Sequence, residues 1–95
     1  MRTTRREQPK PTTPPSAKAI ESLRNLAAYG GAVKANLTDM RKAGLHGNCA
    51  HALERRGLIT TEERDIQYRE WAGRELGTFY HMITDEGRAL LDGLA

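Results

Sequence analysis

Apolar residues recur at helical spacing through the first half of the chain, directly after a proline-rich leader. A first helix is predicted over residues 17–29, with Ser16 as its capping residue and Gly30 and Gly31 as its stop. Its apolar face would hold Ile20, Leu23, Leu26 and Ala27. The pattern therefore predicts an amphipathic helix at the start of the folded part.

Two further helices are predicted between residues 33 and 56. The second covers about residues 33–43, and Gly44 can take the positive φ that ends a helix. Its buried stripe would consist of Val33, Leu37 and Met40. The third starts near residues 46–48, where Asn48 is a good N-cap, and runs to Arg56. Its inward residues would be Cys49, Ala50 and Leu53, and its outward residues Asn48, His51, Ala52 and Arg55.

The pattern then changes from helical spacing to alternation. Residues 58–61 and residues 78–83 are rich in β-branched and aromatic side chains and are predicted to pair as an antiparallel ribbon. The charged residues 62–77 between them form a long hairpin, whose inner part extends the strands. Tyr68 and Trp71 would either be an exposed stacking or partner-binding surface or fold back onto the first helix, which is the more common fate of large aromatic side chains.

A short last helix is predicted over residues 85–93. Thr84 resembles an N-cap, and Asp85 and Glu86 fall in the first turn, where the helix dipole favours negative charge. Its packing residues would be Ala89, Leu90, Leu91 and Leu94. The order helix, helix, helix, strand, strand, helix predicts a small α+β domain over residues 16–95.

All four prolines lie within residues 1–15, among basic and polar side chains. Such a segment buries too little apolar surface to offset its ordering entropy, so a disordered basic arm is predicted there. The arm carries Arg2, Arg5, Arg6 and Lys10 against Glu7, so the whole net charge of +3 lies in it. It is either a solubilising leader or an arm that touches phosphates or a minor groove. In the folded part, affinity for nucleic acid must come from local placement of basic residues.

Several classes of protein are disfavoured by what the chain lacks. It has no apolar run of about 18 residues and no apolar segment behind its basic N-terminus, so a soluble, cytoplasmic protein is expected. The single cysteine, Cys49, is expected to be a small buried hydrophobe. His46, His51 and His81 lack the paired short spacings of a zinc site, so no metal and no cofactor is expected. No nucleophile and base can be paired by spacing, which disfavours an enzyme.

Two segments carry a resemblance to a known family. Residues 52–59, ALERRGLI, are followed by an aromatic strand and by residues 83–91, ITDEGRALL. In this order, separated by a charged hairpin, they resemble the recognition-helix exit, wing return and following helix of MarR-like and PadR-like winged-helix regulators. The similarity covers residues 17–95 in element order. It implies a winged helix-turn-helix fold and a small DNA-binding transcriptional regulator.

The resemblance also implies how the protein would meet double-stranded DNA. The third helix, about residues 46–56, would read base edges in the major groove with Asn48, His51 and Arg55. Phosphate contacts would come from the preceding helix, the end of the third helix and the hairpin, which acts as the wing: Lys34, Arg41, Lys42, Arg56, Arg64, Arg69 and Arg74. Acidic residues alternate with the hairpin arginines. The sequence therefore fits a solvent-exposed hairpin without DNA contacts as well as it fits a DNA-binding wing.

The modest core favours a homodimer. Because the long extra helices of MarR-like and PadR-like proteins are missing, such a dimer would use the first helix, the last helix or the wing. An alternative function is a protein–protein interaction module on the same scaffold, for example a phage-type protein that binds a host factor. RNA binding through the same helix and arm ranks third, since no RNA-binding motif with stacking aromatics is present.

Overall fold

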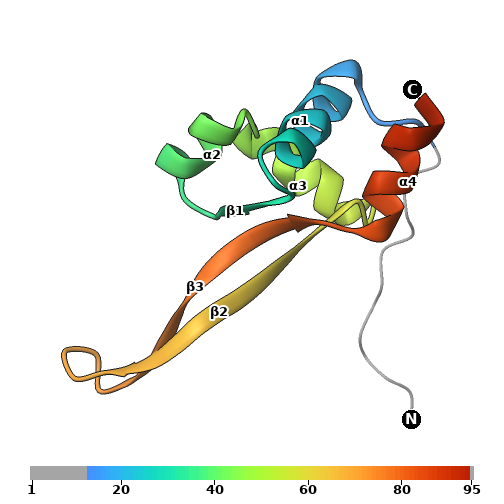
Figure 1. Ribbon diagram of the computed structural model, residues 1–95. Coiled ribbons are helices and arrows are strands. Elements are labelled where there is room, and N and C mark those ends of the chain that lie inside the picture. Colours follow the sequence, from blue (N-terminus) through green and yellow to red (C-terminus); the bar gives the residue numbers. More distant parts are fainter. Residues whose placement is uncertain (1–12, 95) are drawn as a thin grey trace, which may run out of the picture.

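A computed structural model describes residues 13–94, which form four helices and a three-stranded antiparallel sheet (Figure 1). The elements follow in the order α1 (Ala17–Ala28), β1 (Ala32–Lys34), α2 (Leu37–Ala43), α3 (Gly47–Arg55), β2 (Ile59–Arg69), β3 (Arg74–Ile83) and α4 (Asp85–Leu94). The α+β class that the sequence predicts is therefore confirmed. The arm predicted over residues 1–15 lies outside the described residues up to Thr12.

Helix α1 forms where the sequence predicts it. The Ser16 hydroxyl oxygen accepts a hydrogen bond from the backbone N–H of Ala19 at 3.1 Å, which satisfies one of the donors that a helix start leaves unpaired. Leu23 and Leu26 are fully buried, while Ile20 and Ala27, expected on the same face, are half-buried. The capping residue and the centre of the apolar face are thus confirmed.

A short strand replaces the predicted first turn of the second helix. Residues 32–34 pair with β3, with Val33 opposite His81, and the sheet order is β1-β3-β2. Helix α2 starts only at Leu37, because the Asn36 side chain accepts from the Asp39 backbone N–H at 2.8 Å and caps the helix there. Val33 is buried, but as a residue of strand β1, and the Leu37 side chain is 69% exposed. The prediction of a helix from residue 33, with Leu37 in its buried stripe, is wrong.

Two polar side chains of α1 hold the turn between α2 and α3. The Asn25 side-chain amide donates to the Gly44 carbonyl oxygen at 3.0 Å, and the buried Ser22 hydroxyl accepts from the His46 backbone N–H at 3.4 Å. Gly44 has φ +77° and ends α2 as predicted. Because the chain is held at residues 44–46, His46 becomes the N-cap position of α3. The prediction of Asn48 as that N-cap is wrong, and Asn48 lies in the first turn.

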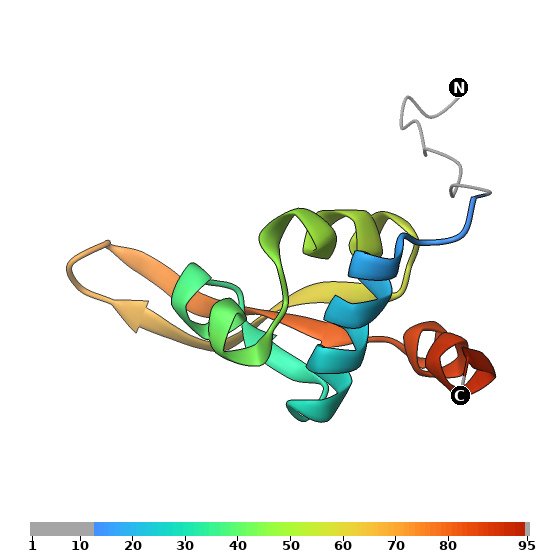
Figure 2. The same cartoon turned by 90° about the horizontal axis from the view of Figure 1, so that it is seen from above.

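The two longer strands form the predicted antiparallel ribbon, and pairing continues from Ile59 opposite Ile83 to Arg69 opposite Arg74. Only the base of this hairpin reaches the helices, and the rest extends away from them, on the opposite side of α1 from α4 (Figures 1 and 2). Trp71 and Tyr68 are 80% and 62% exposed. The interpretation that these aromatic residues fold back onto the first helix is therefore wrong, since extended pairing carries them outward.

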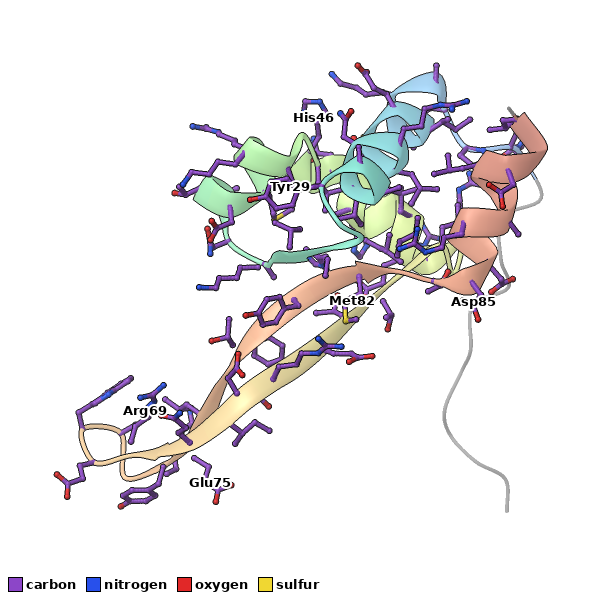
Figure 3. All side chains as sticks on the ribbon, in the orientation of Figure 1. Tyr29, His46, Arg69, Glu75, Met82 and Asp85 are labelled. Atoms are coloured by element: carbon purple, nitrogen blue, oxygen red, sulfur yellow. The ribbon has the colours of Figure 1, made fainter. Side chains whose placement is uncertain are left out.

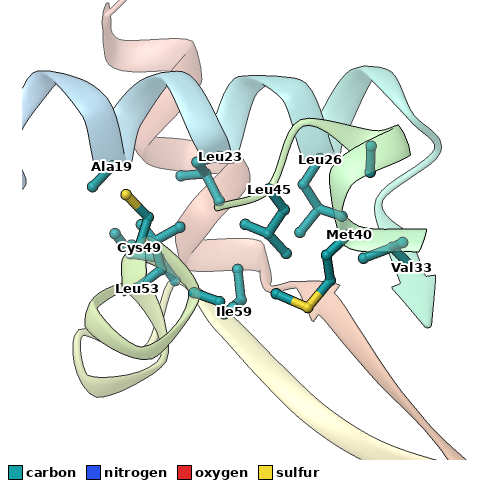
Figure 4. Packing of buried hydrophobic residues seen from close by; sticks show 12 residues of the cluster. Ala19, Leu23, Leu26, Val33, Met40, Leu45, Cys49, Leu53 and Ile59 are labelled. Atoms are coloured by element: carbon teal, nitrogen blue, oxygen red, sulfur yellow. The ribbon is translucent and has the colours of Figure 1, made fainter. Parts of the chain in front are cut away.

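The core lies between α1, α2, α3 and the base of the sheet (Figure 4). Cys49, Ala50 and Leu53 of α3 are buried as predicted, and Leu58 and Ile59 close the underside of the helices. The other buried apolar residues are Ala19, Leu23, Leu26, Val33, Met40, Ala43 and Leu45. Ile83, Leu90 and Leu91 pack against this cluster from the end of β3 and from α4.

One hydroxyl group joins the two motifs that stand out in the sequence. Thr84 Oγ1 donates to the Gly57 carbonyl oxygen at 2.7 Å and accepts from the Gly87 backbone N–H at 3.0 Å. The Thr84 backbone N–H donates to the Leu58 carbonyl oxygen at 3.1 Å. Thr84 is thus the N-cap of α4, as predicted, and it also fixes α4 against the exit from α3. Gly87 is buried beside Leu58, and a β-carbon on it would overlap the Leu58 carbonyl oxygen.

This packing makes two glycines of α4 differ sharply in their tolerance of a methyl group. Gly87→Ala is expected to destabilise the protein by about 1–3 kcal/mol, because α4 must move away from Leu58. At Gly93 an added β-carbon would have no heavy atom within 4 Å, so Gly93→Ala should be neutral or stabilising by up to about 1 kcal/mol. Urea unfolding followed by circular dichroism measures both. Equal effects of the two substitutions would contradict the packing described for Gly87.

Candidate nucleic-acid interface

Helix α3 presents a polar face to solvent. Its buried residues Cys49, Ala50 and Leu53 occupy one side, so the positions between them point outward. Asn48, His51 and Arg55 are all exposed, and their spacing of three and four residues aligns them in one stripe along the helix. The three residues predicted to contact bases therefore share one exposed surface.

The basic residues predicted before α3 are exposed as well. The prediction of Lys34 on the second helix is wrong, because it is the last residue of β1, whereas Arg41 and Lys42 lie in the last turn of α2, next to the turn that leads into α3. Arg56, directly after α3, is half-buried, and its guanidinium group donates to the Thr13 carbonyl oxygen. Arg56 thus connects the end of α3 to the chain that enters α1.

The pleat of the hairpin places Glu63 and Glu75 on the face opposite its arginines, although Glu62, paired with Tyr80, stays on the same face as the arginines. Side chains of directly paired residues project from the same face of a sheet, and the face alternates along each strand. Arg64 is paired with Thr78, and Arg69 with Arg74, and Thr78 and Arg74 are an even number of residues apart on β3. The three predicted wing arginines therefore share one face, which we call the arginine face. Glu63, Tyr68, Glu75 and Phe79 project from the opposite face.

A β-bulge produces this arrangement. Arg64 and Arg69 are five residues apart and would lie on opposite faces of a regular strand, but the register shifts between Arg64 and Gln67. Asp65 takes φ +57° there, and Gly77 lies across from the extra residue. The Gly77 backbone N–H donates to the Glu63 carboxylate at 2.9 Å. A β-carbon on Gly77 would lie 2.7 Å from the Arg64 carbonyl oxygen, so the bulge requires glycine.

The arginine face ends at the hairpin tip in two arginines, and the exposed Glu70 follows Arg69 in the loop. Arg69 and Arg74 are directly opposite each other, and like charges in this position are destabilising. Within residues 13–94 neither guanidinium group forms an ion pair, whereas Arg64 lies 3.5 Å from the Glu62 carboxylate. Figure 3 shows Arg69 and Glu75 pointing to opposite sides of the hairpin tip, with Arg69 toward the side on which the helices lie. The tip is therefore suited to an anion.

The described residues carry no cluster suited to a metal ion. Among residues 13–94 no three histidine, cysteine, aspartate or glutamate side chains come together as ligands. Cys49 is buried on the core side of α3, as the sequence predicts, and His46 is exposed at the start of that helix. On α2 and α3 the exposed side chains include Arg41, Lys42 and Asn48, whereas the hairpin exposes basic and acidic residues together, the acidic ones being Glu62, Glu63, Asp65, Glu70 and Glu75.

The comparisons with known proteins found no matching family model, no matching curated protein and no matching solved structure. No helix within residues 13–94 has the length and apolar character needed to cross a membrane. A function must therefore be inferred from the surfaces of the chain itself.

The sequence identifies the basic and polar residues that could contact DNA, but it does not show which of them share one surface of the protein. Nothing in the pattern of residues 62–77 shows which charged side chains share a face, because the face depends on the bulge. The signal available was Gly77, an isolated glycine within a strand pattern, which often marks a bulge.

Gly77→Ala is expected to disrupt the outer hairpin and leave the helical core intact, because the new methyl group would meet the backbone of Arg64. Amide hydrogen exchange should become faster over residues 62–78, by an amount equivalent to about 1–3 kcal/mol, with α1 and α3 unchanged. Thr78→Ala, one position along the same strand, serves as the control and should change exchange little. Unchanged protection in Gly77→Ala would show that the bulge does not require glycine.

Proposed function

We propose that the protein is a winged helix-turn-helix DNA-binding protein that acts as a transcriptional regulator. The observation that carries this proposal is the short connection through residues 44–46 between α2 and α3, which leaves the polar stripe of α3 exposed beside a projecting hairpin. In helix-turn-helix proteins the second helix of such a pair enters the major groove. The order helix, strand, helix, helix, strand, strand, helix supports the winged form of this fold, with β2 and β3 as the wing.

In this proposal α3 reads the bases. Asn48 and His51 lie in its first half, where recognition helices approach base edges most closely. An asparagine amide matches the acceptor and donor of adenine, and a histidine ring nitrogen can donate to guanine acceptors. Arg55, at the last position of α3, contacts either guanine or a phosphate.

Phosphate contacts then determine how the protein is oriented on the duplex. Arg41 and Lys42 lie next to the turn that leads into α3, and Lys34 lies before α2 at the end of β1; all three are exposed, so they are available to the strands that border the groove. Arg56, which donates to the Thr13 carbonyl oxygen, and the three arginines of the arginine face add to this basic surface in the proposal. A homodimer on a palindromic site fits the stripe of α3, because two copies can then place their third helices in successive major grooves.

Substitution of the base-reading residues tests the assignment of α3. Asn48→Ala and His51→Ala are each expected to weaken binding to the preferred site by about 1–3 kcal/mol, because one base contact is lost. Binding to unrelated duplex should change little, since its energy comes from phosphates. The preferred site comes from selection among random duplexes, and fluorescence anisotropy then measures both affinities. An equal loss on both kinds of duplex would remove α3 as the reading element.

The charge of the hairpin can be tested by salt dependence. The double variant Arg69→Gln/Arg74→Gln should lower the slope of log affinity against log salt by about 2, as expected for two lost phosphate contacts. The double variant Lys18→Gln/Arg24→Gln removes the same charge from exposed positions on α1 and should leave the slope nearly unchanged. Equal slopes for the two variants would exclude the hairpin arginines from phosphate binding.

A protein–protein interaction module is the second candidate, because the hairpin also exposes apolar side chains. Ile66, Tyr68 and Phe79 are each more than half exposed. If micromolar protein binds no duplex even at low salt while a defined protein partner binds the hairpin, this second function replaces the first.

A further inference from the structure

The loop at the end of the hairpin carries the one tryptophan of the chain, and the fold gives it no packing role. Trp71 lies between the paired residues Arg69 and Arg74 and is 80% exposed, more than any other large hydrophobic side chain of residues 13–94. A tryptophan offers a large apolar surface that is costly to leave in water, and such residues are concentrated at binding sites. The exposed ring of Trp71 is therefore suited to contact with a ligand that covers it.

The neighbours of Trp71 indicate the chemistry of that ligand. Arg69 and Arg74 are held opposite each other by the strand register, and no acidic side chain in residues 13–94 forms an ion pair with either. Glu75 and Glu63 project from the other face of the ribbon, and Glu63 is engaged with the Gly77 backbone. The tip thus combines an exposed aromatic ring with two arginines that form no ion pair within residues 13–94, and with one exposed carboxylate, that of Glu70, in the loop between Arg69 and Trp71. A polyanion with stackable rings matches both features, and nucleic acid has this composition.

We propose that Trp71 stacks on a base step from the minor groove of duplex DNA, while Arg69 and Arg74 bind the phosphates or groove walls on either side of it. This inference rests on the proposed function and adds a specific role for the hairpin tip. The minor groove is about 6 Å wide, too narrow for the two strands but wide enough for side chains from the loop at their end. Arginine is drawn to narrow minor grooves by their negative potential, and apolar side chains that enter them partly unstack a base step and bend the duplex.

The arrangement favours this partner over a protein. The exposed apolar residues best suited to a protein, Tyr68 and Phe79, lie on the face opposite the arginines, so they would not join Trp71 in one apolar patch beside Arg69 and Arg74. Arg69 and Arg74 thus flank the loop that carries Trp71, and Tyr68 and Phe79 belong to the opposite face of the strands.

Because Trp71 is the single tryptophan, its fluorescence reports directly on its surroundings. The full-length protein is titrated with a duplex of about 30 base pairs that carries a dye at each end. Anisotropy of one dye measures binding, energy transfer between the dyes measures bending, and tryptophan emission measures stacking. We expect emission to be quenched in step with binding, and energy transfer to rise as the duplex bends.

Matched variants separate stacking from a general effect on the hairpin. Trp71→Ala should weaken duplex binding by roughly fivefold to a hundredfold and abolish the bend, because aromatic stacking on a base is lost. Trp71→Phe should retain most of the bend, since a smaller ring can still enter the step. Phe79→Ala removes an exposed aromatic residue from the opposite face and should change neither affinity nor bending.

Each other outcome overturns a defined part of the proposal. If the duplex binds without quenching the tryptophan emission, and Trp71→Ala binds and bends the duplex as the wild type does, Trp71 has no role in binding. The proposed DNA-binding function would then remain. Stronger quenching by single-stranded than by duplex DNA would also overturn it, because Trp71 would then stack on unpaired bases. Loss of a protein partner in Trp71→Ala with duplex binding unchanged assigns the tip to protein binding. Failure of every duplex to bind at low salt overturns the proposed function itself.

Discussion

The Thr84 hydroxyl is the contact on which the arrangement of the other elements depends. The hydroxyl donates to the Gly57 carbonyl oxygen and accepts from the Gly87 backbone N–H. It thereby links the residues that follow α3, the end of β3 and the first turn of α4. Gly57 and Thr84 are 27 residues apart in the chain, so this contact closes the whole hairpin. A single hydroxyl satisfies two backbone groups here, and the close approach of Gly87 to Leu58 leaves no room for a larger residue.

That junction explains why the hairpin projects where it does. Where β2 begins and β3 ends, Ile59 and Ile83 pack against the helices. Strand pairing then continues outward without further contact with the core. An unsupported two-stranded ribbon is only marginally stable in water. The bulge at Asp65, with its glycine partner and the Glu63 contact to the Gly77 backbone, therefore shapes a segment in which few other interactions compete.

The sequence predicted the helices best where a cap and an apolar stripe agreed. Ser16 and Leu23 mark α1, Thr84 marks α4, and Cys49 and Leu53 mark the buried side of α3, because capping and burial are both local signals. β1 was missed because Val33 suits a helix stripe and a strand equally, and the choice depends on its pairing with His81 far along the chain. Asn48 was misassigned as a cap because the contacts from Ser22 and Asn25 that fix the turn are also long-range.

The candidate contact residues divide in the same way. Their identities, and the exposure of Asn48, His51 and Arg55 on one stripe, could be read from helical spacing, since period and burial determine the face of a helix. Which hairpin arginines act together could not, because one extra residue at the bulge reverses the parity of every position beyond it. By itself the sequence determined the α+β class, the two motifs and the list of basic residues. Only the tertiary structure decided that Arg64, Arg69 and Arg74 share a face, because strand register is set by contacts between distant residues.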